Sequence, residues 1–465
     1  MSLQNTMPMQ KPIEPLLSRW SQNNITTTPS LVMSDYWFLA GLMLALFFVA
    51  DPFMIRLDKI AITKHLPLMI SLCGVLLTNI GNLILRTTNH REPLRSWQVL
   101  SAGLPLILLG IWIVLGSLYA RKHGGINNTF ITVGIYMLFT FLAARVVMLS
   151  PARAKIVRAY LLTAALFGVF MVLRMAASLG SNEGSFHELE ALIIPLAVYF
   201  ALRPMNSRFW KAFLTLFFLV AGIVVQKNTG FLVLVLVLLY LWIAEWRFRF
   251  RESVSFRFWT MLWLIVLLLS GIAAAGYLAH QRGELLPTGN PQYRLKTYDV
   301  AINRFYQSPG WGTGFTAPAT EKFTAYAINS AHGILATHSD ILDLAAQGGA
   351  IALFLWLWGY MRITVISVRH ALRGARPRDD MHAAAHALAC MSLTTIVVYA
   401  FNPILLQPDK AFLVWGQFGM LLGVALYLSN KPDSKPGTAV TASETTSSIA
   451  NSKVATTMMI TKKDE

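Results

Sequence analysis

Long apolar runs limit this chain to a helical membrane fold. Runs of 18 or more residues with few charges recur along its 465 residues, and each is long enough to cross the hydrocarbon core of a bilayer as a helix. Of all residues, 55% are hydrophobic and 13% are charged, whereas about 25% are charged in a typical soluble domain. The sequence does not show the short alternating segments of a membrane β-barrel. We therefore predict an all-α polytopic membrane protein.

The apolar runs predict about twelve transmembrane helices. They lie at residues 33–50, 66–85, 97–119, 129–149, 156–178, 187–203, 209–226, 229–246, 258–279, 340–361, 384–405 and 411–429. Lys and Arg gather in alternate connections, most densely in R247-F-R-F-R251 and R369-H-A-L-R-G-A-R-P-R378. Because basic residues collect in cytoplasmic loops, this pattern places both termini in the cytoplasm. Topology then explains the net charge of +17, and we expect no nucleic-acid partner.

The predicted spans divide the chain into five parts. Residues 1–32 form a cytoplasmic N-terminal segment, 33–279 carry the first nine transmembrane helices, and 340–429 carry the last three. Between them, residues 280–339 form the longest hydrophilic segment, which the topology places on the outer side. It is too rich in aromatic residues for disorder, so we expect one large folded loop. Residues 430–465, rich in Ser, Thr, Ala and Lys, predict a disordered cytoplasmic tail.

Ionisable residues within or beside predicted spans are candidates for function. Arg174 lies near the outer end of the fifth span. It either pairs with the short acidic connection that follows or binds an anion. Lys227 lies in V225-Q-K-N-T-G230, a polar break between two apolar runs, and is either an interfacial lysine or a cation facing a lipid phosphate. Arg145 lies near the cytoplasmic end of its span, where its long side chain can reach the headgroups.

The outer loop contains two recognisable pieces. Residues 290–304 predict a helix, with Arg294 near its start. The stretch S308-P-G-W-G-T-G-F315 follows as a glycine-rich turn, in which Gly312 and Gly314 could present backbone N–H groups to an anion. No Gly-Lys-Ser/Thr follows the turn, so it does not have the pattern of a nucleotide-binding loop.

His338 comes just before the tenth predicted span, in T337-H-S-D-I-L-D343. An imidazole with a pKa of about 6.5 suits a general base at neutral pH, although a histidine at a helix start is more often a cap or a surface residue. Asp340 and Asp343 could orient this histidine, and Asp340 could equally cap the helix. His332 and His338 are six positions apart, not the four that place two ligands on one helical face, so we expect no metal site.

In motif and order, residues 220–420 resemble the O-antigen ligase and polymerase superfamily of bacterial envelope glycosyltransferases. The helix that begins near Arg294 precedes a Pro-x-x-Gly-x-Gly turn, as in the family. His338 and Ser339 are then followed by nine residues and Gly349, which is the ligase spacing. Near the end, the stretch that begins F401-N-P-I-L-L-Q-P looks like the family's closing pair of helices.

The resemblance implies both a fold and a reaction. The fold is a GT-C-like membrane glycosyltransferase of the bacterial inner membrane, with its active site facing the periplasm. The donor is O-antigen on undecaprenyl diphosphate, and for a ligase the acceptor is a sugar hydroxyl of lipid A–core, joined in lipopolysaccharide assembly. His338 would activate this hydroxyl as a general base. Arg294, Lys227 and Arg174 would hold the departing diphosphate, with inversion at the anomeric carbon and without a metal or cofactor.

The sequence departs from the family pattern at a position of the proposed site, and alternatives to the ligase function stay open. Thr229 occupies the position at which many relatives carry an arginine, and Lys227 lies two residues earlier. O-antigen polymerases and protein O-oligosaccharyltransferases share the same motifs and the same lipid-linked donor. The spacing from His338 to Gly349 favours ligation to a lipid. A transporter or flippase is less favoured, because the sequence shows no inverted repeat.

Overall fold

A computed structural model describes most of the chain between residues 33 and 430. The described residues are 33–50, 65–73, 75–76, 92–122, 128–177, 189–224, 228–250, 290–315, 339–373, 377, 379–401, 404 and 408–430. The chain divides into a compact unit, Met1–Leu426, and a second unit, Tyr427–Glu465. All regular structure in the described ranges is helical, which confirms the all-α class predicted from the sequence.

The helices fall into an N-terminal and a C-terminal series. The first comprises α2 (Met33–Ala50), α4 (Glu92–Ala102), α5 (Leu104–Lys122), α6 (Asn128–Leu149), α7 (Arg153–Ala177), α8 (Glu190–Ile193), α9 (Leu196–Leu202), α10 (Arg208–Val224) and α11 (Asn228–Phe250). The second comprises α13 (Asn290–Gln307), α14 (Asp340–Arg373), α15 (Asp380–Phe401) and α16 (Pro408–Asn430).

Several helices have the length and composition of membrane spans. Within the described ranges five are long and apolar enough to cross a bilayer, namely α7, α11, α14, α15 and α16, and shorter apolar helices occur in α2, α5, α6 and the α8–α9 region. The predicted span at 258–279 and half of that at 66–85 lie outside the described residues. These helices support a multi-spanning membrane protein, and the number twelve stays a prediction.

Two predicted spans are each divided into two helices. The span expected at 97–119 breaks at Gly103, between α4 and α5. Pro105 lacks the N–H that would continue the helical hydrogen bonds, and the ring of Phe141 packs at the break, where a Cβ on Gly103 would lie 2.1 Å from it. The span expected at 187–203 is divided into α8 and α9. A hydropathy pattern does not reveal either break, because the apolar composition continues through both.

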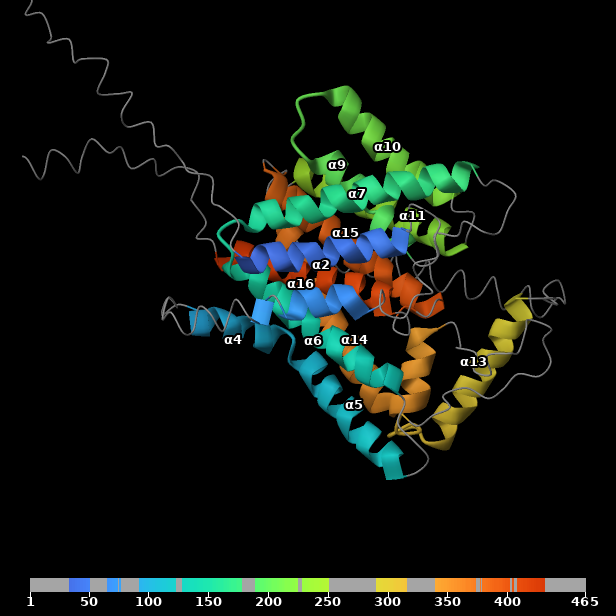
Figure 1. Cartoon of the computed structure of the whole chain (residues 1–465). Helices are drawn as coiled ribbons and strands as arrows, with labels where there is room; N and C mark the ends of the chain where they lie inside the picture. The colour runs from blue at the N-terminus through green and yellow to red at the C-terminus, as the bar shows by residue number, and fades with distance from the viewer. Residues whose placement is uncertain are drawn as a thin grey trace, which may run out of the picture. The chain divides into compact units, whose positions relative to one another are not determined.

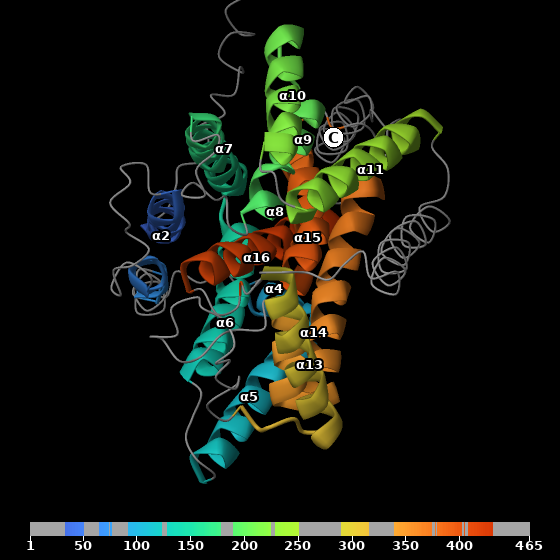
Figure 2. The same ribbon diagram turned by 90° about the vertical axis from the view of Figure 1, so that its right-hand side faces the viewer.

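The C-terminal helices form the centre of the first unit. The share of the apolar segment that is buried is 78% in α15 and 83% in α16, against 44% in α7. Helix α15 packs against α7, α8, α9, α11 and α14, and it lies among these helices in Figures 1 and 2. Stacked and edge-on rings hold this core together, with Tyr360 4.7 Å from Phe418 and Trp356 5.1 Å from Tyr399 between ring centroids.

Polar contacts join helix ends that the predicted topology places on the cytoplasmic side. Arg203, after α9, donates from Nε to Oδ1 of Asp380 at 2.7 Å, and Arg158 of α7 approaches the same carboxylate at 3.4 Å. Ser150, after α6, donates to Asp35 of α2 at 2.8 Å. The predicted alternation of spans assigns these ends to one face, and the topology itself stays a prediction.

Candidate functional site

Gly349 interrupts α14 near its start. Its backbone dihedrals, φ 69° and ψ −171°, lie in a region that only glycine adopts without strain. The turn from Ser308 to Phe315 packs into this interruption, and it also contains two left-handed glycines, Gly312 (φ 64°) and Gly314 (φ 72°). The glycine turn and the Gly349 break thus form one backbone junction, which joins the end of α13 to the first part of α14.

Backbone hydrogen bonds close this junction. In an unbroken helix the N–H of Ala350 would donate to the carbonyl of Ala346, but here it donates to Pro309 at 2.7 Å. Thr313 supplies the missing donor to Ala346 at 3.1 Å, and Gly314 donates to Gln347 at 2.9 Å. The turn therefore satisfies the polar groups that the break in α14 exposes.

These hydrogen bonds decide what the glycine turn can do. The N–H of Gly312 donates to Ser308 within the turn, and those of Thr313, Gly314 and Phe315 donate to carbonyls of α14. All four N–H groups point at protein oxygens, so they do not form the anion-binding nest that the glycine pattern allowed. The turn has a supporting role, because it positions α13 and α14 relative to each other.

A pocket of about 420 Å³ lies between α5 and the glycine turn. Its lining residues come from these two elements and are Trp112, Leu115, Gly116, Tyr119, Ser308, Trp311, Gly312, Gly314 and Phe315. The ring of Trp112 stacks on that of Trp311, with centroids 4.7 Å apart. The indole N–H of Trp112 donates to the carbonyl of Gly348 at 3.0 Å. Helices α5 and α13 thereby meet the same end of α14 (Figure 2).

Arg294 lies in α13 and points toward the end of α15. Its Nη1 donates to the carbonyl of Phe401 at 3.2 Å, and its side chain also hydrogen-bonds Tyr298. Burial raises the pKa of Tyr298, the Arg294 guanidinium lowers it, and the Asp343 carboxylate raises it. The Arg294 and Asp343 side chains therefore both lie within electrostatic reach of Tyr298. A guanidinium has five N–H donors, so these two partners leave it capacity to hold an anion as well.

The start of α14 is fixed by Ser339 and Asp340. The hydroxyl of Ser339 accepts a hydrogen bond from the N–H of Leu342 at 3.4 Å, as an N-cap does. The Asp340 carboxylate instead accepts one from the N–H of Ile404 at 2.7 Å. This hydrogen bond ties α14 to the connection between α15 and α16, and it is buried, because Asp340 is only 1% exposed. Of the two roles that the sequence left open for Asp340, the cap belongs to its neighbour.

Thr229 has a buried carboxylate as its partner. Its hydroxyl donates to Oε1 of Glu190 at 2.7 Å, and both residues are buried. The position at which many relatives carry an arginine is thus committed here to a hydrogen bond between the starts of α8 and α11. Glu190 is the last acidic residue of the connection that follows Arg174, and Thr229 is one of its partners.

Three of the predicted site residues are not positioned by the structure. His338 and Lys227 lie outside the described residues, and Arg174 lies in the last turn of α7 with its side chain outside them. In the ranges that the structure does describe, no three His, Cys, Asp or Glu side chains gather to hold a metal ion. The junction brings Gly312 and Gly314 to the break at Gly349. Arg294 and Asp343 both lie within electrostatic reach of Tyr298.

Residues 212–357 match a family model described as O-Antigen ligase. The matched range contains Lys227, Arg294, His338 and the glycine junction, whereas Arg174 precedes it. No curated protein matches the chain. The resemblance predicted from the motifs is confirmed over this range.

Proposed function

We propose that this protein is an O-antigen ligase. It transfers O-antigen polysaccharide from undecaprenyl diphosphate to a sugar hydroxyl of lipid A–core, at the periplasmic face of the bacterial inner membrane. The observation that carries the proposal is the O-Antigen ligase match at residues 212–357. Its range includes His338 and, eleven residues on, Gly349, at which the structure places the glycine junction.

The proposed general base is His338, which precedes the first residue of α14 by two positions in the sequence. The adjoining helix is held by the Ser339 cap, by the bond from Ile404 to Asp340, and by the junction at Gly349. A general base next to a firmly held helix start favours proton transfer in a defined geometry, and this fixed start supports the proposal. In the reaction, His338 takes the proton of the acceptor hydroxyl.

The glycosyl transfer then forms one bond and breaks one bond at the anomeric carbon. The acceptor oxygen bonds to the anomeric carbon, the bond from that carbon to the diphosphate oxygen breaks, and undecaprenyl diphosphate leaves with the electron pair. Attack opposite the leaving group inverts the anomeric centre. Arg294, Lys227 and Arg174 stabilise the negative charge that develops on the diphosphate. The role of Arg294 is supported by its hydrogen bonds: Phe401 and Tyr298 are its described partners, and they leave some of its N–H groups able to bind the diphosphate.

The test uses purified full-length protein, a lipid-linked O-antigen donor and lipid A–core, with EDTA present. Transfer is followed as a shift of the acceptor on a gel for the wild type, His338→Ala and His332→Ala. His332 lies six positions earlier and is a matched control for losing a histidine from the same segment. We expect transfer by the wild type and His332→Ala, and a loss of about 100-fold or more in His338→Ala, as for removal of a general base.

Three results would contradict parts of this proposal. Normal transfer by His338→Ala would exclude His338 as the base. Lengthening of the donor glycan with an unchanged acceptor would identify a polymerase. Transfer that stops in EDTA and returns with a divalent cation would show that basic residues alone do not stabilise the leaving group.

A further inference from the structure

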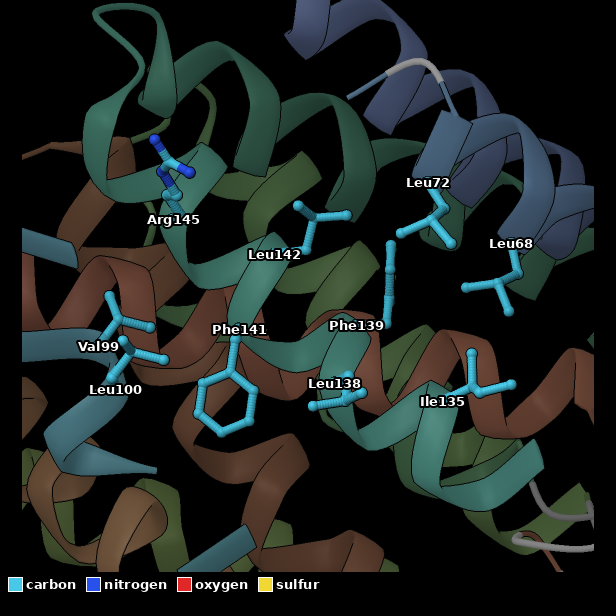
Figure 3. Close-up of a pocket in the computed structure, with 10 residues that line it drawn as sticks. All are labelled: Leu68, Leu72, Val99, Leu100, Ile135, Leu138, Phe139, Phe141, Leu142 and Arg145. Carbon is cyan, nitrogen blue, oxygen red and sulfur yellow. The ribbon is translucent and has the colours of Figure 1, made fainter. Parts of the chain in front are cut away.

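A second pocket lies outside the range of the family match, between α6, α4 and residues 65–73 (Figure 3). Its volume is about 370 Å³. The lining is apolar apart from one arginine and consists of Leu68, Leu72, Val99, Leu100, Ile135, Leu138, Phe139, Phe141, Leu142 and Arg145. An apolar groove with one charged group has the polarity of an amphiphile.

The length of this groove matches one leaflet of a bilayer. Ile135, Leu138, Leu142 and Arg145 follow one another at spacings of three and four residues, which places them on one face of α6. Ten residues of helix rise by about 15 Å, which is half of the roughly 30 Å hydrocarbon core. Figure 3 shows Arg145 toward one end of this face and Ile135 toward the other.

The groove is also accessible from the side. Leu138 is 55% exposed and Ile135 is 43% exposed, so these lining residues reach the surface that the surrounding lipid covers in a membrane. An acyl chain could enter laterally and lie along α6. Because the groove opens on side chains that are already lipid-facing, a lipid is the amphiphile that its position favours.

Arg145 supplies the charge. Its Nε is buried and has no hydrogen-bond partner in the part of the chain that the structure describes. A buried N–H without a partner is costly, and a guanidinium matches a phosphate through two parallel hydrogen bonds. The predicted topology places Arg145 at the cytoplasmic end of its helix, where phospholipid phosphates lie. The position that the sequence assigned to simple snorkelling is thus also suited to hold a headgroup.

We propose that this groove binds one anionic phospholipid of the cytoplasmic leaflet. The lipid phosphate bonds to Arg145, and one acyl chain follows the apolar face of α6 toward Ile135. Charge complementarity with Arg145 and the one-leaflet length of the groove together identify this occupant. The site is separate from the proposed transfer site, because none of its lining residues is among those proposed to act in transfer.

Native mass spectrometry of the full-length protein in detergent tests the proposal. Dioleoyl phosphatidylglycerol and dioleoyl phosphatidylcholine are titrated separately, and retained lipid is counted per protein. We expect the wild type to retain phosphatidylglycerol at a concentration about tenfold lower than phosphatidylcholine. Both lipids offer a phosphate to Arg145, but the choline group adds a positive charge beside the guanidinium. Arg145→Gln should abolish this preference, and Leu138→Trp, which fills the groove, should reduce retention of both lipids.

Arg369→Gln is the matched control, because it removes the same charge from an exposed position on α14. It should leave the preference intact. An unchanged preference in Arg145→Gln, an equal loss in Arg369→Gln, or unchanged retention in Leu138→Trp would overturn the site. Tighter retention of undecaprenyl phosphate than of phosphatidylglycerol would overturn the assignment of the occupant. None of these outcomes depends on transfer activity, so the site and the proposed function fail separately.

Discussion

Gly312 and Gly349 pack backbone against backbone. A Cβ on Gly312 would lie 2.6 Å from the nitrogen of Gly349, and a Cβ on Gly349 would lie 2.7 Å from the nitrogen of Gly312. Neither position can therefore accept a side chain without a shift of main chain. This contact sets the distance between the turn that follows α13 and the break in α14. It thereby also sets the position of Arg294, in α13, relative to the start of α14.

Substitution of Gly349 by alanine should open the junction. Alanine is strained at a φ of 69°, and its Cβ would lie 2.2 Å from the carbonyl oxygen of Gly310. We expect a loss of about 3 kcal/mol in the free energy of unfolding and a large loss of transfer. Thermal unfolding in detergent measures the first effect. Gly310→Ala is the control, because a Cβ at Gly310 meets nothing within 4 Å; equal stability losses in both variants would contradict the packing argument.

Substitution of Asp340 should separate α14 from the connection after α15. Asp340→Ala removes the acceptor of the Ile404 N–H and leaves a buried donor unsatisfied, which costs about 1–3 kcal/mol. Asp340→Asn keeps an acceptor oxygen and should recover most of the stability. Unfolding midpoints and transfer rates are compared for both variants. An alanine variant as stable and as active as the wild type would show that the contact has no structural weight.

The indole N–H of Trp112 can be tested apart from its ring. Trp112→Phe keeps an aromatic surface for Trp311 but removes the donor to Gly348, so we expect a loss of about 1 kcal/mol. Trp112→Ala also loses the stack and should cost more. Trp97→Phe, at a 69% exposed position on α4, is the control in the same unfolding assay. A Trp112→Phe variant no less stable than this control would argue against the hydrogen bond.

The raised pKa of Tyr298 predicts that the stability of the protein falls at high pH. Burial raises the pKa of its phenol in the folded protein, whereas in the unfolded chain it is about 10. The folded state then keeps a proton that the unfolded state has lost, so this stabilising contribution declines as the pH rises above about 10. Tyr298→Phe should lose less stability than the wild type between pH 8 and 10.5. Identical declines in the two proteins would contradict the pKa shift.

The sequence predicts the helices of this protein better than their interruptions. Helix α13 begins and ends within a few residues of the stretch expected at 290–304. The breaks at Gly103 and Gly349 were not predicted, because the apolar pattern continues through both. Gly349 itself was identified by its spacing from His338, but its dihedrals depend on a turn that precedes it by more than thirty residues.

The candidate site shows the same limit. The residue type and rough position of Arg294 followed from the loop pattern, but its partner is the backbone carbonyl of Phe401, and a carbonyl carries no signal in a sequence. The Ile404 N–H that bonds Asp340 is hidden for the same reason. Trp112 lies in an apolar run in which nothing distinguishes it from a lipid-facing ring. Such contacts are set by packing between distant segments, which a local pattern does not encode.

The hydrogen bond from Trp112 to Gly348 has a consequence for biogenesis. The two residues are 236 positions apart, so at a translation rate of about 5–20 residues per second α5 is made about 10–50 s before its acceptor exists. During that interval the indole N–H must find water or a headgroup. A nascent chain that stops before α14 also lacks the α14 carbonyls that accept hydrogen bonds from the glycine turn. We therefore expect truncated products to stay open at this point and to be recognised by membrane quality-control proteases, so that only full-length chains accumulate.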